Sequence, residues 1–240
     1  MKLPPSWQLP STIKNRLGQK SAGKQRAMIA EGHLLLVLHR APTLGEKQRQ
    51  GVFFWRDPQG KWECSAGGVG LKPLMKHIQV YEEAENVLSL AYGEAEQAED
   101  YFNLLEQLAP LQHSTQNLHN TLQAAREGIP EDRDIIDLRD WAYGIERSLN
   151  LLHENIKNSL DYRIAERVEQ QNAIALESVR ASHRLNILVA IFFPLTAITC
   201  IFGMNLNSGL AESFSFWLIL LISLTLGFWV RRWVIVGRLW

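Results

Sequence analysis

Hydrophobic residues are distributed unevenly along the chain, and two long uncharged runs lie near its C-terminal end. Residues 185–202 (LNILVAIFFPLTAITCIF) and 214–230 (FSFWLILLISLTLGFWV) contain no Asp, Glu, Lys or Arg. A helix needs roughly 20 predominantly apolar residues to cross a hydrocarbon core of about 30 Å. The pattern predicts two transmembrane helices, although two buried helices of a soluble protein are the alternative.

The charges that flank these runs predict the orientation of the chain. Arg180 and Arg184 precede the first run, Arg231 and Arg232 follow the second, and the connection between the runs has no Lys or Arg. Because basic flanks stay on the cytoplasmic side, we expect both termini to be cytoplasmic. The chain is then a multi-pass protein of the cell (inner) membrane, with the short connection outside.

A helical pattern precedes the first run without a break. Apolar residues recur in steps of three and four from Leu138 to Val168, and no capping signal interrupts them before the membrane. This predicts one helix over residues 132–202, roughly 105 Å long at about 1.5 Å per residue. Residues 71–108 and 112–126 are expected to form two earlier helices, the second ending at Gly128.

The N-terminal part has the pattern of short strands. Residues 33–39, 52–56 and 61–65 are rich in Val, Leu, Phe and Trp, and Asp57–Gly60 supplies a turn between the last two. They predict a small antiparallel sheet of three or four strands. The fold class is therefore an α+β membrane protein with a small sheet domain, a long helical cytosolic stalk and two C-terminal transmembrane helices.

These patterns divide the chain into seven segments. They are a basic flexible arm (1–30), a small β-rich cytosolic domain (31–70), a cytosolic helical region with the stalk (71–184), a first transmembrane helix (185–202), an external loop (203–213), a second transmembrane helix (214–230) and a cytosolic tail (231–240).

Composition excludes several function classes. Lys+Arg and Asp+Glu both number 25, so the formal net charge is zero, and no basic folded domain indicates a nucleic-acid partner. The two cysteines, Cys64 and Cys200, are far apart in the sequence, and the second lies in an apolar run, so they do not predict a disulfide framework. The histidines lack the spacing of a metal enzyme and no Gly-x-Ser-x-Gly occurs, so we expect no enzyme activity and no cofactor.

The end of the first run carries a more specific signal. Phe193-Pro194-Leu195-Thr196, followed by Ile201-Phe202-Gly203-Met204-Asn205, resembles the signature of the CorA-type two-span divalent-cation channels. The resemblance implies a homopentameric funnel with a pore lined by the first spans, and an ion-selective ring at Gly203, Met204 and Asn205. The Gly203 carbonyl and the Asn205 amide would contact a hydrated Mg²⁺, which gives up its waters reluctantly.

Below this ring, one face of the predicted helix has the character of a pore lining. Val189, Phe193, Thr196 and Cys200 recur in steps of four, three and four, and with Leu185 they form an apolar path with one hydroxyl ring. The alternative is that this face packs against the second span, with Thr196 bonded to a backbone carbonyl.

Three acidic positions outside the membrane have a further expected role. The family holds its channel shut with magnesium between cytosolic domains, and Asp134, Asp137 and Asp140 could supply one side of such a site, although a solvated helix face is the alternative. Glu212 is the one acid of the external loop and could attract cations, in place of the Met-Pro-Glu segment that family loops usually carry.

The function predicted from the sequence is a homo-oligomeric channel that passes hydrated divalent cations across the membrane. Magnesium is the expected ion, with cobalt or nickel also passing, and the partners are other copies of the chain, the lipid bilayer and the cations. Two alternatives remain open: a zinc-type transporter of the same fold, because Cys200 would add a soft ligand, and a non-conducting membrane-anchored scaffold or sensor, because the N-terminal domain is short.

Overall fold

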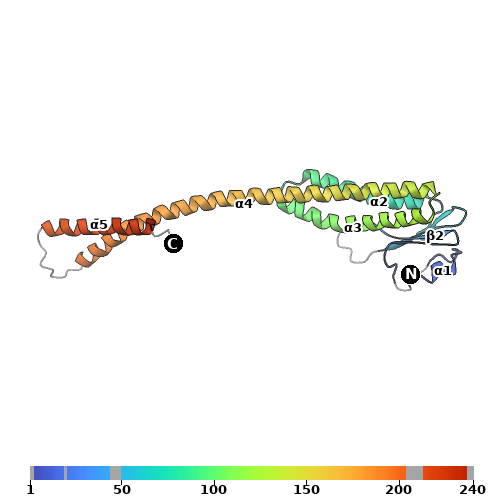
Figure 1. The fold of residues 1–240 in the computed structure, drawn as a ribbon, viewed down its shortest axis with the longest axis horizontal. Helices are drawn as coiled ribbons and strands as arrows, with labels where there is room; N and C mark the ends of the chain where they lie inside the picture. Colours follow the sequence, from blue (N-terminus) through green and yellow to red (C-terminus); the bar gives the residue numbers. More distant parts are fainter. Residues whose placement is uncertain (1–2, 19–20, 44–49, 204–212, 237–240) are drawn as a thin grey trace. The chain divides into compact units, whose positions relative to one another are not determined.

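The computed structural model describes residues 3–18, 21–43, 50–203 and 213–236. These form two compact units, Met1–Ala165 and Glu166–Trp240. The first unit is an antiparallel sheet with helices, and the second consists of the continuation of one long helix and a final helix (Figure 1). The architecture is α+β, as the sequence predicts.

The sheet is a four-stranded antiparallel meander in the order β1-β2-β3-β4. Strands 33–39, 52–56 and 61–65 are confirmed to within a residue or so, whereas the sequence did not predict the first strand. Glu31 and Gly32 join it to the second with φ of 53° and 76°, the paired positive values of a two-residue hairpin turn. The strands are β1 Arg26–Ala30, β2 His33–His39, β3 Gly51–Arg56 and β4 Trp62–Cys64.

Both faces of this sheet are buried, which explains why the middle of β2, Leu34–Leu38, is apolar throughout. Side chains alternate along a strand, so Leu34, Leu36 and Leu38 join the cluster beneath the helices, while Leu35 and Val37 face the other side.

The opposite face is covered by the N-terminal segment. Trp7, Leu9 and Ile13, the last in the short helix α1 Ser11–Lys14, are at most 5% exposed. They pack on Met28, Leu35, Val37, Phe53 and Trp55, and the ring centroids of Trp7 and Trp55 lie 5.6 Å apart. The predicted flexible arm over residues 1–30 is therefore wrong, because its few apolar residues complete a second core.

Two helices, α2 Lys72–Glu94 and α3 Ala98–Gly128, cover the first face. The predicted break near residues 109–111 is wrong. The chain turns at residues 95–97 instead, where a capping box between Gln97 and Asp100 starts α3. Pro110 lies inside α3 on its exposed side, where water can satisfy the carbonyl that proline leaves without a donor.

The long helix α4 Arg133–Gly203 has 71 residues and confirms the predicted continuous helix to within one residue. Asp132 caps its start by accepting a hydrogen bond from the Ile135 amide at 3.3 Å. The same carboxylate pairs with Arg56 on β3 at 2.7 Å, and both side chains are largely buried. This ion pair ties the beginning of α4 to the sheet.

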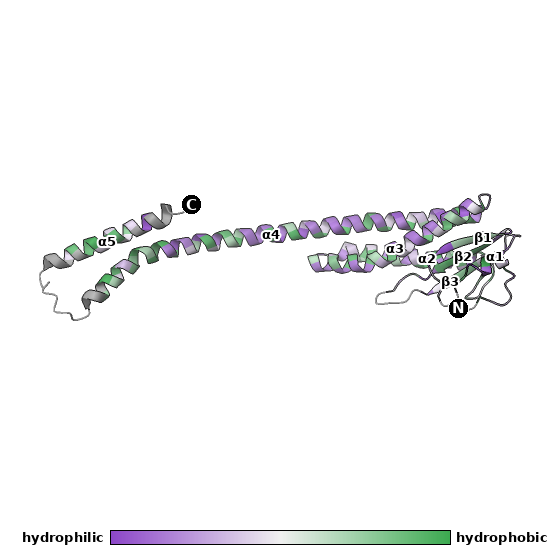
Figure 2. Ribbon diagram, turned by 60° about the horizontal axis from the view of Figure 1, so that its bottom comes forward, coloured by the Kyte–Doolittle hydropathy of each residue, from purple (hydrophilic) through white to green (hydrophobic). Residues whose placement is uncertain are grey.

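The first part of α4 packs against α2 and α3 through Ile135, Leu138, Ile145, Leu149 and Ile156, all less than 5% exposed. Figure 2 shows the change of character further along: polar colours dominate the middle of α4, and apolar colours its last part.

The final helix is α5 Ser213–Val236. Among the described residues, α4 is the helix whose length and apolar composition suit a membrane crossing, and Leu220–Trp229 in α5 is a shorter apolar stretch.

Candidate pore on the last part of α4

The second unit is organised around a close contact between α4 and α5. Gly227 on α5 faces the backbone of Ile191 on α4, and a Cβ at Gly227 would lie 3.0 Å from the Ile191 carbonyl oxygen. Ala190 and Ser223 are 8% and 1% exposed. Small residues at such positions let helix backbones approach closely in a membrane, so this contact fixes which face of α4 is covered by α5.

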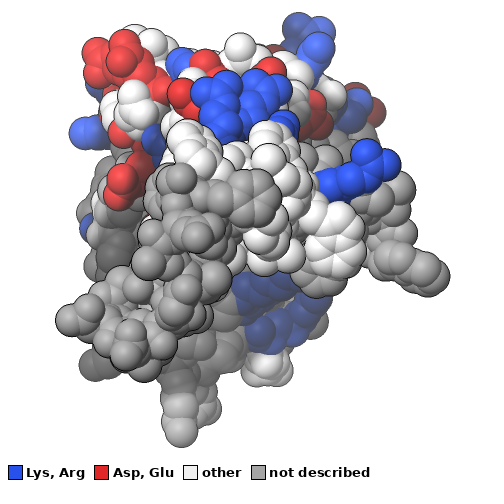
Figure 3. Space-filling view, turned by 90° about the vertical axis from the view of Figure 1, so that its left-hand side faces the viewer, with Lys and Arg blue, Asp and Glu red and all other residues white. Residues whose placement is uncertain are grey.

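The residues expected to line a pore lie on the other face of α4. Leu185, Val189 and Phe193 are 60%, 52% and 69% exposed, and Thr196 and Cys200 are exposed as well. By contrast, the side chains of Ile187, Ile191 and Ile198 are half-buried. The five predicted residues therefore share one face that α5 leaves uncovered, which we call the uncovered face. Figure 3 looks at this end of the molecule: white side chains lie beside the grey atoms, and blue Lys and Arg and red Asp and Glu side chains are visible around them.

Thr196 is the one hydroxyl among the five residues of the uncovered face. Its Oγ1 donates to the carbonyl oxygens of Phe192 at 3.0 Å and Phe193 at 2.9 Å, one turn back on the same helix. A hydroxyl that donates to its own helix presents its oxygen outward as an acceptor. Pro194, two residues earlier, leaves the Ala190 carbonyl without its helical donor.

The uncovered face continues along α4 before the apolar run. At about 100° per residue, Ser182, Ser178 and Gln171 fall within about 20° of Val189, and all three are exposed. Arg180 and Arg184 fall about 140–180° away. Before the apolar run, this side of α4 is thus neutral and polar over several turns, while the two arginines lie on the opposite side.

Of the predicted selectivity residues, Gly203 alone lies among the described residues. Gly203 is the last residue of α4, and Met204, Asn205 and the loop acid Glu212 lie outside the described residues.

The comparisons with known proteins decide the family. The family described as CorA-like Mg²⁺ transporter protein matches residues 75–235, about two thirds of the chain. The chain belongs to this CorA-like family. No curated protein matches the chain.

Two solved structures are also similar to the chain. The structure of the full-length CmaX protein has a TM-score of 0.50 at 15% identity, and the alignment covers 92% of this chain and 79% of that one. The CorA magnesium transporter from Methanocaldococcus jannaschii gives a TM-score of 0.49 at 16% identity, with 95% of this chain and 83% of that one covered. At these identities the CmaX comparison supports the fold alone.

The three aspartates expected to take part in regulation, Asp134, Asp137 and Asp140, are exposed in this CorA family member. Asp134 lies in the first turn of α4, where the positive end of the helix dipole stabilises a carboxylate. Asp140 pairs with the adjacent Arg139 at 2.8 Å. Within the described parts of the chain, no group of three or more His, Cys, Asp or Glu is arranged to hold a metal ion. One copy of the chain therefore offers Asp134, Asp137 and Asp140 as separate carboxylates.

Polar contacts join the helices of the first unit. The Trp141 indole donates to Glu82 at 3.0 Å, and the Ser148 hydroxyl donates to the nearly buried Glu85 at 2.6 Å. They attach α2 to α4 in a fixed register.

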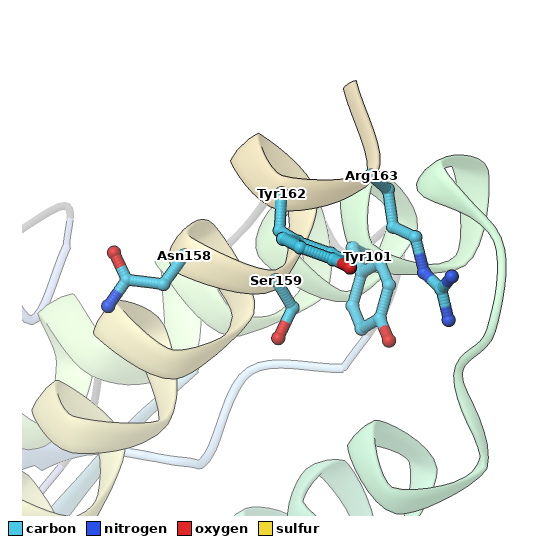
Figure 4. Close-up of a pocket in the computed structure, with 5 residues that line it drawn as sticks. All are labelled: Tyr101, Asn158, Ser159, Tyr162 and Arg163. Atoms are coloured by element: carbon cyan, nitrogen blue, oxygen red, sulfur yellow. The ribbon is translucent and has the colours of Figure 1, made fainter. Parts of the chain in front are cut away.

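A polar pocket of about 350 Å³ lies between α3 and α4. Figure 4 shows that the rings of Tyr101 and Tyr162 lie next to each other while Asn158 and Arg163 point to opposite sides. These polar groups do not converge on one point, so the pocket has little of the character of a binding site.

Sequence reasoning missed the α4–α5 contact, although its signal is present. Ser223 and Gly227 are small residues four positions apart in an apolar run, a spacing that is typical of helix packing in membranes.

Proposed function

We propose that the chain assembles with copies of itself into a channel that passes hydrated divalent cations, magnesium above all, through a membrane. The observation that carries the proposal is the uncovered face of α4, which bears Val189, Phe193 and Thr196 while α5 packs on the other side. Membership of the CorA-like Mg²⁺ transporter family supports the choice of ion.

A single copy cannot enclose a path for ions, because two helices have no lumen between them. Closing a ring of identical chains places their uncovered faces around a common axis, where they surround a path. Five copies is the number that the family resemblance implies. In such a ring α4 lines the path and α5, which packs on the far side, faces the lipid.

The lining suits a cation that keeps its water. Val189 and Phe193 offer no ligand, and Thr196 offers a neutral hydroxyl oxygen that can accept from the waters of a hydrated ion. No Asp or Glu lies between residues 178 and 211. The neutral residues Ser182, Ser178 and Gln171 extend this lining beyond the apolar run.

Selection is proposed to occur at the ring formed by the Gly203 carbonyl, Met204 and the Asn205 amide. Asn205→Ala should abolish magnesium uptake, because a methyl group cannot hold a hydrated ion, and should leave assembly intact. The test is magnesium entry into vesicles that contain the purified protein and an internal magnesium-sensitive dye. Asn207→Ala, the same change two residues further along, is the control and should conduct normally.

Three outcomes distinguish the candidate functions. Magnesium flux that Asn205→Ala removes supports the channel, and no divalent flux from the well-folded wild type supports the scaffold or sensor. The exposed thiol of Cys200 on the uncovered face favours the zinc transporter as second candidate. That function requires Cys200→Ala to abolish zinc passage while sparing magnesium.

Asp134, Asp137 and Asp140 are proposed as one half of a regulatory magnesium site. The other half would come from a neighbouring copy, since one copy does not bring three carboxylates together.

A further inference from the structure

A second pocket lies in the first unit, between the edge of the sheet and the start of α2. Its walls include Val52 and Phe54 on β3, Cys64 on β4, and His77 and Val80 on α2. Its volume is about 590 Å³, within the range of roughly 300–1,000 Å³ that is typical of small-molecule sites. No part of the proposed ion path is involved.

The inside of this pocket is apolar and uncharged. Val52, Phe54 and Cys64 are at most 9% exposed, and the ring of His77 meets Phe54 edge-on at a centroid distance of 5.3 Å. Burial lowers the pKa of His77 to about 4. A hydrogen bond to the His39 backbone raises this pKa, but by less than burial lowers it. The imidazole is therefore neutral at pH 7, and an apolar molecule would meet no buried charge here.

One polar atom of the wall is unsatisfied. The Nε2 of His77 is buried and has no hydrogen-bond partner among the described residues. The bond to the His39 backbone must then use Nδ1, which leaves Nε2 as an acceptor. This nitrogen adds no charge to the wall, because an imidazole that accepts at Nε2 is neutral.

The rim of the pocket carries the opposite character. Arg40, directly after β2, and Lys76 on α2 both line it, and both are exposed. Among the described residues that line the pocket none is acidic, so within this described lining neither cation has a carboxylate partner. The charge of Arg40 is close enough to oppose protonation of His77. Guanidinium and ammonium groups at the mouth of an apolar cavity suit an anionic group at the end of an apolar ligand.

We propose that this pocket binds a small organic carboxylate whose apolar body packs against Phe54, Val52 and Val80 and whose carboxylate pairs with Arg40 and Lys76. A metal ion does not suit the pocket, because Cys64 and His77 are the only soft ligands among its described lining residues. A fully polar ligand would leave the apolar wall without a partner. The proposal is independent of ion transport and stands whether or not the chain conducts.

The test uses Cys64 as a reporter, since it lines the pocket and is one of two cysteines in the chain. In the full chain with Cys200→Ala, the rate at which iodoacetamide labels Cys64 is measured against increasing 4-phenylbutyrate. The neutral 4-phenylbutanamide, matched in shape, is the control for partition into detergent. We expect saturable slowing of the labelling, with the acid acting at an about tenfold lower concentration than the amide.

The double variant Arg40→Gln/Lys76→Gln identifies the charges responsible. Both side chains are exposed, so the fold should be preserved, and the advantage of the acid over the amide should disappear while the effect of the amide persists. Labelling that the acid does not slow, or slows no more than the amide does in the unaltered pocket, overturns the proposal. This comparison needs no variant in the pocket and is therefore decisive even if the double variant fails to fold.

Discussion

At the scale of single residues, Thr196 is where backbone geometry and the proposed chemistry meet. Its hydroxyl hydrogen is directed to the carbonyls of Phe192 and Phe193, so its oxygen faces outward from the helix as an acceptor. In the proposed channel, this threonine would bond its own helix and also offer an acceptor to a passing hydrated ion.

Replacing this hydroxyl should weaken conduction without stopping it. Thr196→Val keeps the shape and removes one polar ring from an otherwise apolar path, so magnesium flux into vesicles should fall by less than in Asn205→Ala. Thr196→Ser keeps the oxygen and should conduct like the wild type. Equal flux in Thr196→Val and the wild type would show that the hydroxyl does not face the path.

His77 provides a prediction for the pH dependence of folding. Its folded-state pKa is about 4, against an ordinary value of 6.5, so below pH 6.5 the unfolded chain binds a proton that the folded chain does not. Stability is complete above pH 6.5 and is lost as the pH falls toward 4, by about 3 kcal/mol in all.

His77→Phe keeps a ring against Phe54 and removes the titration. Thermal unfolding of the full chain between pH 7 and pH 4.5 should show a steeper loss of stability in the wild type than in this variant. Parallel pH profiles for the two proteins would contradict the neutral, buried state of His77.

The residues of the uncovered face could be predicted to share one side of α4 because helical periodicity is regular. Val189, Phe193, Thr196 and Cys200 recur at helical spacing, and a straight helix places them on one face whatever surrounds it. Periodicity does not say which face a neighbouring helix covers. That depended on the contact between Gly227 and Ile191, which involves two segments far apart in the sequence.

At the scale of elements, the close approach of α4 and α5 should depend on Gly227. A leucine there would place atoms against the Ile191 backbone, and overpacking of this kind costs about 1–3 kcal/mol. We expect Gly227→Leu to lower the thermal midpoint of the detergent-purified protein. Gly144→Leu, at an exposed position of α4 with nothing within 4 Å of an added Cβ, is the matched control. A midpoint unchanged in Gly227→Leu would mean that α5 does not pack there.

The elements that sequence reasoning placed wrongly share a physical cause. Residues 1–30 are basic and contain proline, so their composition indicated a solvated arm, yet Trp7, Leu9 and Ile13 are enough to cover one face of the sheet. The helix break expected near residues 109–111 is also absent, because Pro110 lies on an exposed side of α3, where it is tolerated. Neither outcome is visible in the local pattern, because sequence alone does not show what a segment packs against or which side of a helix stays exposed.

At the scale of the whole molecule, a conducting path of the proposed kind requires several copies of the chain. The exposed apolar residues of the uncovered face, such as Phe193 at 69% exposure, are unsuited to line a water-filled path alone, but a ring of them forms a constriction that closes by excluding water. In the proposed ring, the neutral residues Ser182 and Ser178 would extend the path beyond the apolar run, with Arg180 and Arg184 on the opposite side of the helix.

The central claim, that the uncovered face of α4 lines a conducting path, is tested most directly by single cysteines in a Cys200→Ala background whose own magnesium flux is measured first. Val189→Cys and Thr196→Cys lie on the uncovered face, while Ile187→Cys and Ile198→Cys lie two residues away toward α5 and serve as partners matched in depth. A water-soluble methanethiosulfonate reagent should block magnesium entry into vesicles through the first pair and leave the second pair conducting. Block that is equal in both pairs, or confined to Ile187→Cys and Ile198→Cys, would contradict the account.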